Sequence, residues 1–157
     1  MKVIFLMPGK EPDEALDKLI KNYESRITHF IHYESKVLSV SRIIRSGDSQ
    51  QIRQKESDLI RNEFLPGDFI VLLDERGLEM GSVEFSGWIR KKMNASPRRM
   101  VFVCGGAYGV DSMLMEMANE KISLGKMTLP HQLVRLVFSE QLYRAFTLLH
   151  GQKYHHE

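Results

Sequence analysis

The sequence contains little cysteine and no long apolar run. Cys104 is the only cysteine, which excludes an internal disulfide and a cysteine-based metal cluster. A single cysteine fits a protein of the reducing cytoplasm. No apolar segment approaches the roughly 20 residues that span a bilayer, and residues 3–7 are too few for a signal peptide. We therefore expect a cytoplasmic protein without a membrane segment and without a metal site.

An excess of charge of either sign is also missing. Twenty-two Lys and Arg against 20 Asp and Glu give a net charge of +2, with a pI near 8.7. This balance excludes a strongly polybasic nucleic-acid binder but leaves a weaker preference for RNA open. There is no internal repeat and no low-complexity segment. The length suits one domain with a substantial core, so we expect a single domain over residues 1–157.

Short apolar runs alternate with segments of helical spacing. The runs predict buried strands at residues 2–7, 36–40, 69–73, 100–104 and 122–124. The helical spacing predicts helices from residue 13 to about 30, around 52–64, after an N-cap at Ser82, from 112 to about 121, and over 132–150. This alternation predicts an α/β fold, with a parallel sheet and helices on both faces.

The last predicted helix is apolar around most of its circumference, including Leu136, Val137 and Tyr143. In a domain of this size, such a helix suggests that a second copy of the chain covers one face. We therefore expect a homodimer. Two polar exceptions, His131 and Arg135, lie along one stripe. They either hold an anionic ligand or pair within the dimer interface.

Two loops that follow predicted strands have unusual backbone freedom. Residues 105–109, Gly-Gly-Ala-Tyr-Gly, follow the fourth strand, and residues 124–131 join the fifth strand to the last helix. Within the second loop, Gly125 permits backbone angles that other residues avoid, and Pro130 suits a helix start. If the two strands are neighbours, their loops form one crevice at the edge of the sheet. We expect a ligand there, and we expect a side chain at Gly106 to intrude on it.

The ligand in this crevice is expected to lack phosphate groups. The dinucleotide fingerprint needs a different glycine spacing after the first strand, and no Walker sequence is present. Asp111 begins the helix after the first loop, where a bound phosphate would need positive potential. Cys104, with no His and Asp constellation nearby in the sequence, is interpreted as a small core residue.

Taken together, these motifs resemble those of the RlmH family, whose members are SPOUT-class methyltransferases. The resemblance extends over essentially the whole chain and is most specific in its C-terminal half. It rests on Leu72-Leu73-Asp74 with Gly77, residues 102–109, residues 124–131, residues 140–145, and Tyr154-His155. This chain has Gly125 where many relatives have serine, and it ends Tyr-His-His-Glu without a basic residue after Tyr-His.

The resemblance implies a SPOUT-type parallel sheet with a C-terminal trefoil knot. It also implies a homodimer that transfers a methyl group from S-adenosyl-L-methionine to N3 of a pseudouridine in large-subunit (23S) rRNA of assembled ribosomes. In that dimer the tail, residues 152–157, completes the partner's site. The implied cofactor-binding residues are Leu73, Gly105, Gly106, Leu124, Gly125, Lys126, Met127, Thr128, Leu129 and Pro130. The residues implied for base handling are His155, Tyr154, His131 and Arg135.

Two other functional classes stay open at the level of sequence. One is a non-catalytic RNA- or ribosome-binding module of the same fold, and the other is a small-molecule enzyme that uses an unrelated nucleotide. Cofactor binding separates them, because a ligand that binds only the native state raises its stability. A basic face for RNA could come from Arg42, Arg45, Arg98 and Arg99, which could equally be ordinary solvated surface.

Overall fold

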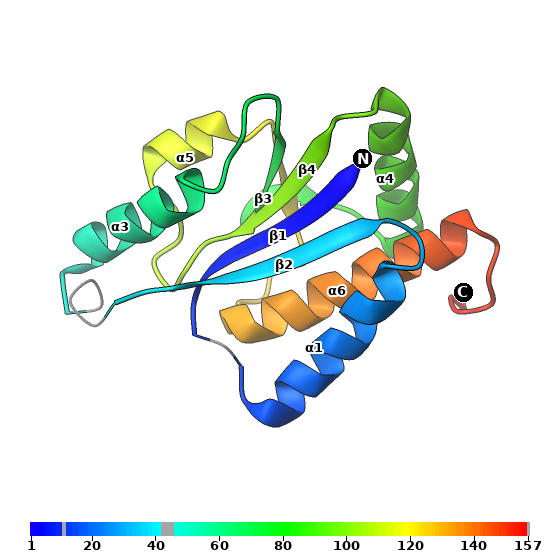
Figure 1. The fold of residues 1–157 in the computed structure, drawn as a ribbon, viewed down its shortest axis with the longest axis horizontal. Helices are drawn as coiled ribbons and strands as arrows, with labels where there is room; N and C mark the ends of the chain where they lie inside the picture. Colours follow the sequence, from blue (N-terminus) through cyan, green and yellow to red (C-terminus); the bar gives the residue numbers. More distant parts are fainter. Residues whose placement is uncertain (11, 42–45, 157) are drawn as a thin grey trace.

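A computed structural model gives the fold of residues 1–10, 12–41 and 46–156 (Figure 1). Its centre is one parallel sheet in the order β2-β1-β4-β3-β5. The strands are β1 (Lys2–Gly9), β2 (His32–Ser39), β3 (Phe69–Glu79), β4 (Arg99–Cys104) and β5 (Glu120–Ser123). The predicted parallel sheet is confirmed. The order places β3 between β4 and β5, so the last two strands are not neighbours.

The helices cover both faces of this sheet, as predicted. One face carries α1 (Glu14–Ile27), α4 (Ser82–Ala95) and α6 (His131–Leu149), and α6 packs against both of the others. The opposite face carries α3 (Ser49–Arg61) and α5 (Ser112–Met117). Figure 1 shows α6 running alongside α1, with the C-terminus beside the end of α6.

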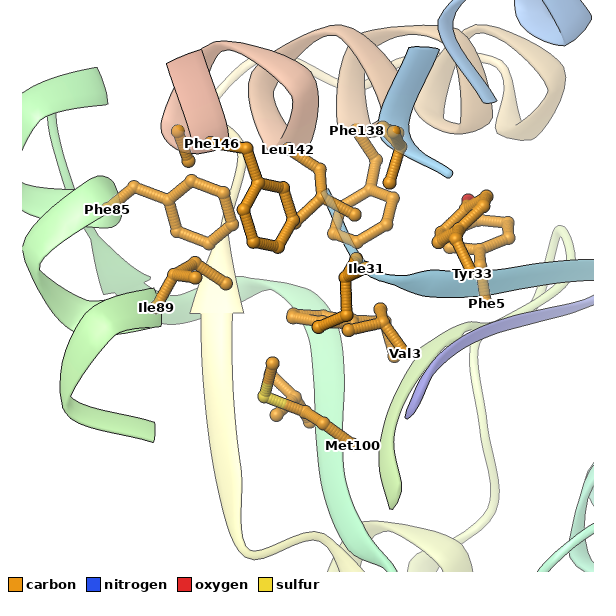
Figure 2. Packing of buried hydrophobic residues seen from close by; sticks show 14 of the residues in the cluster. Val3, Phe5, Ile31, Tyr33, Phe85, Ile89, Met100, Phe138, Leu142 and Phe146 are labelled. Carbon is orange, nitrogen blue, oxygen red and sulfur yellow. The ribbon is translucent and has the colours of Figure 1, made fainter. Parts of the chain in front are cut away.

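The larger core lies between the sheet and α6 (Figure 2). The ring of Phe138 stacks on Phe5 of β1 at 5.1 Å between centroids and meets Phe102 of β4 at 4.6 Å. Phe146, about two turns further along α6, packs in the same layer and is fully buried. Each such side chain stabilises the fold by about 1.5–3 kcal/mol through burial alone. The C-terminal helix is therefore a central part of the core.

Several helix boundaries differ from the sequence expectation by a few residues, as at the end of α1 and at both ends of α3, and two differences have a clear local cause. Gly81, not Ser82, is the N-cap of α4, and its N–H donates to the Glu84 carboxylate at 2.7 Å. The Ser82 hydroxyl instead donates to Gln141 of α6. The helix α5 ends at Met117, before the predicted end near residue 121. Asn119 causes this early end, because its N–H and its side-chain oxygen both bond to the backbone of Ile70, at 2.9 and 2.7 Å.

The second strand starts earlier than predicted. The apolar run at residues 36–40 indicated only its second half, whereas β2 pairs with β1 from Lys2↔His32 to Gly9↔Ser39. The first half of β2 is largely polar because β2 is an edge strand of the sheet. It therefore lacks the apolar run from which a buried strand is predicted. Pairing with β1, which is apolar from Val3 to Met7, determines its length. Over the described ranges, no helix is long and apolar enough to cross a membrane.

Candidate functional site

A cleft of about 920 Å³ opens at the carboxyl ends of β4 and β5, where β3 bulges between them. Three segments form its walls: residues 73–76 of β3, the glycine-rich loop (residues 105–109), and the β5–α6 loop (residues 124–130). The first turn of α6 closes it with His131 and Val134. This volume lies within the range of sites for drug-sized ligands.

The predicted crevice between the two glycine-bearing loops exists, but its geometry differs from the expectation. The two loops do not follow neighbouring strands, because β3 lies between β4 and β5. The register of β3 shifts between Leu73 and Leu78, and the intervening residues form a third wall of the cleft. Sequence reasoning assigned no site role to Asp74, Glu75 or Arg76. Their signals in the sequence were the abrupt change from an apolar run to Asp-Glu-Arg-Gly and the place of Asp74 and Gly77 in a motif of the family resemblance.

Nine of the ten predicted cofactor-binding residues line this cleft. They are Leu73, Gly105, Gly106, Leu124, Gly125, Met127, Thr128, Leu129 and Pro130. The exception is Lys126, whose side chain is 85% exposed and whose Nζ lies 4.0 Å from a carboxylate oxygen of Glu79. Sequence reasoning did not assign the other lining residues, Asp74, Glu75, Arg76, Cys104, Ala107, Tyr108, Gly109 and Val134, to the site.

The β5–α6 loop begins with a tight turn at Gly125. Its φ of +136° lies in a region that side chains disfavour, as the sequence predicted. The Ser123 hydroxyl closes the turn, accepting from the Gly125 N–H at 3.1 Å and donating to the Gly125 carbonyl at 3.0 Å. At the other end Pro130 is the N-cap of α6, and its carbonyl accepts from the N–H groups of Leu133 and Val134.

The glycine-rich loop contributes backbone to the cleft. The Gly109 N–H donates to the Gly106 carbonyl at 3.0 Å, which closes a small turn. A Cβ added at Gly106 would lie 2.8 Å from Cδ of Glu56 on α3, closer than real Cβ contacts come. The expectation that a side chain at Gly106 would intrude on the ligand stays a prediction, and the structure adds that the Cβ would point at α3. Such a side chain would collide with α3, so the glycine is required by what lies behind the loop.

Asp74 and Cys104, which both line the cleft, have pKa values that are shifted from their ordinary ones. Hydrogen bonds from the Arg76 guanidinium, at 3.0 and 3.2 Å, and from the Arg76 N–H lower the pKa of Asp74. Asp74 therefore places an ionised carboxylate at the rim. Burial raises the pKa of the Cys104 thiol to about 12, which supports its interpretation as a core residue. No group of three His, Cys, Asp or Glu side chains within the described ranges could hold a metal ion.

The four residues predicted for base handling do not meet within one chain. His131 lines the cleft, and its Nε2 lies 3.1 Å from the position that a Cβ of Gly9 would take at the end of β1. Arg135, one turn later in α6, does not line the cleft. Its guanidinium pairs with Glu24 of α1 at 3.1 and 3.3 Å, and its side chain is 6% exposed.

The described part of the tail, residues 152–156, packs against α6 and α1, away from the cleft. The Tyr154 ring meets the edge of Tyr143 at 4.9 Å, and its hydroxyl donates to Glu140 at 3.1 Å. Arg144 contacts Nδ1 of His155 at 3.2 Å. Burial, a hydrogen bond with a neighbouring tyrosine hydroxyl and the Glu140 charge raise the pKa of Tyr154, so its phenol stays protonated. Glu140 lies roughly 13 Å along α6 from His131. Residues 152–156 therefore do not reach the cleft of their own chain.

The predicted basic face is only partly described. Arg42 and Arg45 lie outside the described residues. Arg99 forms an ion pair with Asp68 at 3.0 Å and donates to the Glu63 carbonyl at 3.1 Å. Arg98 is exposed on the turn before β4. Of the two arginines that the structure describes, Arg98 is the exposed one, and exposure is what a contact with RNA requires.

Comparisons with known proteins agree over the full length of the chain. A family model described as "Predicted SPOUT methyltransferase" matches residues 1–155. Proteins from Parabacteroides distasonis, Phocaeicola vulgatus and Bacteroides thetaiotaomicron are each 43% identical over 157 residues, which is 100% of both chains. Each of these relatives carries the name "Ribosomal RNA large subunit methyltransferase H".

Proposed function

This chain belongs to the SPOUT methyltransferase family, and from that premise we propose that it methylates large-subunit ribosomal RNA. The observation that carries the proposal is the cleft of about 920 Å³, which is formed by residues 73–76 of β3, the glycine-rich loop and the β5–α6 loop. The relatives support the choice of substrate, because proteins that are similar from end to end are named for that activity.

The cofactor that suits this cleft is S-adenosyl-L-methionine. The cleft has room for a ligand of that size, and much of its wall is glycine backbone and apolar side chain. S-adenosyl-L-methionine carries a positive sulfonium and no phosphate, which agrees with the ionised Asp74 at the rim and with an acid, Asp111, at the start of α5. When bound, the cofactor supplies an electrophilic methyl group.

The residues proposed to hold the cofactor are those of the three walls. Leu73 of β3 and Leu124 and Leu129 of the β5–α6 loop offer apolar contacts. The backbone at Gly105 and Gly106 offers hydrogen-bonding groups. Lys126 keeps a proposed role only at the mouth of the cleft, because its side chain extends into solvent.

The proposed target is N3 of a pseudouridine in 23S rRNA, within the assembled ribosome in the cytoplasm. In this reaction the protein mainly orients the base and excludes water, which lowers the entropic part of the barrier. The N3 proton must leave, and an imidazole can accept it. His131 is the histidine of this chain that lines the cleft. The low net charge suits a substrate that is recognised through the shape of the ribosome as well as through its phosphates.

The proposed assembly is a homodimer formed through α6. Leu133 is exposed, and Leu136 and Val137 are half-buried on the same side of the helix. Two copies related by a twofold axis perpendicular to α6 would bring these residues together. Each tail would then lie toward the cleft of the other copy, because the C-terminal end of one α6 meets the N-terminal end of the other. Tyr154 and His155 are proposed to act there, across the interface.

A trefoil knot is proposed for the C-terminal part of the chain. The β5–α6 loop lines the cleft together with residues 73–76 of β3 and the loop after β4, and α6 then packs on α1. Such a path fits a chain end that passes through an earlier loop, which few folds allow. Arg135 is proposed to fasten α6 in this position through its ion pair with Glu24.

The direct test uses ribosomes from cells that lack this protein. Purified protein and methyl-labelled S-adenosyl-L-methionine are added to assembled ribosomes and to free large subunits, and digested rRNA nucleosides are analysed by mass spectrometry. We expect one labelled methyl group on a pseudouridine, mainly in assembled ribosomes. Cofactor binding without methylation of either particle would favour the alternative, a non-catalytic ribosome-binding module.

A further inference from the structure

The carboxyl group of Glu56 lies directly behind the glycine-rich loop, on the side away from the cleft. Glu56 belongs to α3, and only 8% of its surface is exposed. The three atoms nearest to a Cβ built on Gly106 are Oε2, Cδ and Oε1 of Glu56. Among the residues that the structure describes, Oε2 has no hydrogen-bond partner. A buried carboxyl group in contact with bare backbone is costly, and it suggests a purpose beyond stability.

The helix α3 also holds the end of the segment that contains this loop. The Ser57 hydroxyl accepts a hydrogen bond from the Asp111 N–H at 2.9 Å. Arg61 donates to the Asp111 carboxylate at 2.6 and 2.8 Å. These contacts anchor the chain five residues after Gly106. The first turns of the loop are supported from behind by Glu56, so α3 determines how far the loop projects into the cleft.

The state of the Glu56 carboxyl group agrees with this supporting contact. Burial raises the pKa of Glu56, so the environment disfavours its charged form. A carboxyl group that loses hydration and rests on backbone acts mainly through its size and its hydrogen-bonding capacity. Glutamine has nearly the same shape and retains an acceptor oxygen, whereas alanine leaves a void.

We infer that Glu56 is a positioning residue whose carboxyl group, packed against Gly106, holds the glycine-rich loop at the height that cofactor binding requires. This inference rests on the proposed function, because it assigns the cleft to S-adenosyl-L-methionine. Glu56 does not line the cleft itself and acts through the backbone of the loop. It also explains why residue 106 is a glycine, since the carboxyl group occupies the space that a side chain would need.

The test measures the affinity of S-adenosyl-L-methionine and of S-adenosylhomocysteine by calorimetry. We expect Glu56→Ala to weaken both by a similar factor, on the order of tenfold, because contacting residues are strongly coupled. Glu56→Gln should restore the affinity to within about twofold of the wild type. Gln54→Ala, on the exposed side of the same helix, is the matched control and should change neither affinity. Weakening of the cationic cofactor alone would indicate a charge effect and overturn the positioning role.

A double-mutant cycle with Gly106→Ala gives a second, independent readout. In the wild-type background this substitution forces a Cβ into the carboxyl group and should lower both the melting temperature and the affinity. In the Glu56→Ala background the space is free, so the same substitution should cost much less. Additive effects would show that the two residues do not act together and would overturn the inference.

A second variant and the wild-type affinity keep the inference testable and separate it from the proposed function. If Glu56→Ala does not fold, Glu56→Asp replaces it in the cycle, because it withdraws the carboxyl group by one methylene and keeps the acid. Wild-type protein that binds no S-adenosyl-L-methionine would overturn the proposed function and this inference with it. Wild-type protein that binds normally, beside a folded Glu56→Ala variant with unchanged affinity, would overturn the inference alone.

Discussion

The guanidinium group of Arg135 and the carboxylate of Glu24 form a buried ion pair that joins α6 to α1 across 111 residues of sequence. The two side chains are 6% and 16% exposed. Tyr33 of β2 lies beside them, and burial together with the Glu24 charge raises its pKa. The pair fastens the last helix to the first at the level where α6 leaves the cleft.

We predict that Glu24→Ala will lower the free energy of unfolding by about 3–5 kcal/mol, the range for removing one partner of a buried ion pair. Denaturant unfolding measures the loss. Asp17→Ala on the same helix is the control, since Asp17 pairs with the exposed Lys21 and should cost less than about 1 kcal/mol. Cofactor affinity well below the melting temperature should be retained. A large loss of affinity in folded protein would give Arg135 a second role.

Cofactor binding is predicted to depend on the open space at Thr128, an exposed residue that lines the cleft. Thr128→Trp should fill part of the cleft and weaken S-adenosyl-L-methionine binding by at least about tenfold, or 1.4 kcal/mol, without unfolding the protein. A thermal-shift titration measures this, since cofactor at 100 times its Kd stabilises the native state by about 2.7 kcal/mol. Gln54→Trp should retain the shift. An equal shift in both variants would place the cofactor elsewhere.

The homodimer is predicted to depend on the exposed side of α6. Leu136→Arg or Val137→Arg should produce a monomer or aggregate, because a charge without a partner would be buried between two copies. Light scattering at low micromolar concentration gives the mass. Leu65→Arg, at an apolar residue exposed in the turn before β3, should remain dimeric. A stable wild-type monomer at that concentration would contradict the prediction.

The tail is predicted to be required for methyl transfer but not for folding. Deleting residues 154–157 removes the contact of Tyr154 with Tyr143, an aromatic pair that contributes about 0.5–1.5 kcal/mol, so the melting temperature should fall only modestly. Methylation of ribosomes should be abolished, because the tail is proposed to close over the target nucleotide in the partner's site.

Mixed dimers decide whether the tail acts across the interface. Chains that lack residues 154–157 are mixed with Thr128→Trp chains, so that one site in each mixed dimer has an intact cleft and an intact partner tail. We expect part of the activity to return. Mixed dimers that form but stay inactive, beside active wild-type dimers treated in the same way, would show that the tail does not act in trans.

The pH dependence of stability is predicted to reflect Asp111. Burial acts to raise its pKa, but hydrogen bonds from Arg61 and the Leu114 N–H outweigh it and hold the pKa below the ordinary 3.8. A carboxyl group with a lowered folded pKa stabilises the fold above its unfolded pKa and loses that contribution as pH falls through the folded value. Asp111→Asn keeps an N-cap acceptor but removes the charge.

This variant should therefore be less stable than wild type by about 1.5–3 kcal/mol at pH 7, the range for a hydrogen bond to a charged group. The difference should narrow as the pH falls from 3.8 toward the lower folded pKa, because the unfolded chain is protonated first and the native carboxylate follows at the folded pKa. Urea unfolding over a pH series measures both values. Asp13→Asn, the same change at the exposed N-cap of α1, serves as the control. A difference that stays constant with pH would exclude the ion pair with Arg61 as its cause.

The sequence by itself determined the order of the strands and helices, the covering of both sheet faces, and the two loops that form the cleft. These features are local. The alternation of buried runs with helical spacing reports burial within one segment, and the glycines of residues 105–109 and Gly125 report backbone conformation within one turn. The family resemblance likewise came from motifs of a few consecutive residues, and nine of the ten residues that it implied for cofactor binding line one cleft.

Only the tertiary structure decided which segments meet. Placing β3 between β4 and β5 brought residues 74–76 into the cleft. Packing of α3 behind the glycine-rich loop put the Glu56 carboxyl group where a side chain of residue 106 would lie. The pairing of Arg135 with Glu24 likewise joins the last helix, α6, to the first helix, α1. No pattern along the chain specifies such partners, because a buried charge or a glycine is compatible with many neighbours until the packing of distant segments selects one.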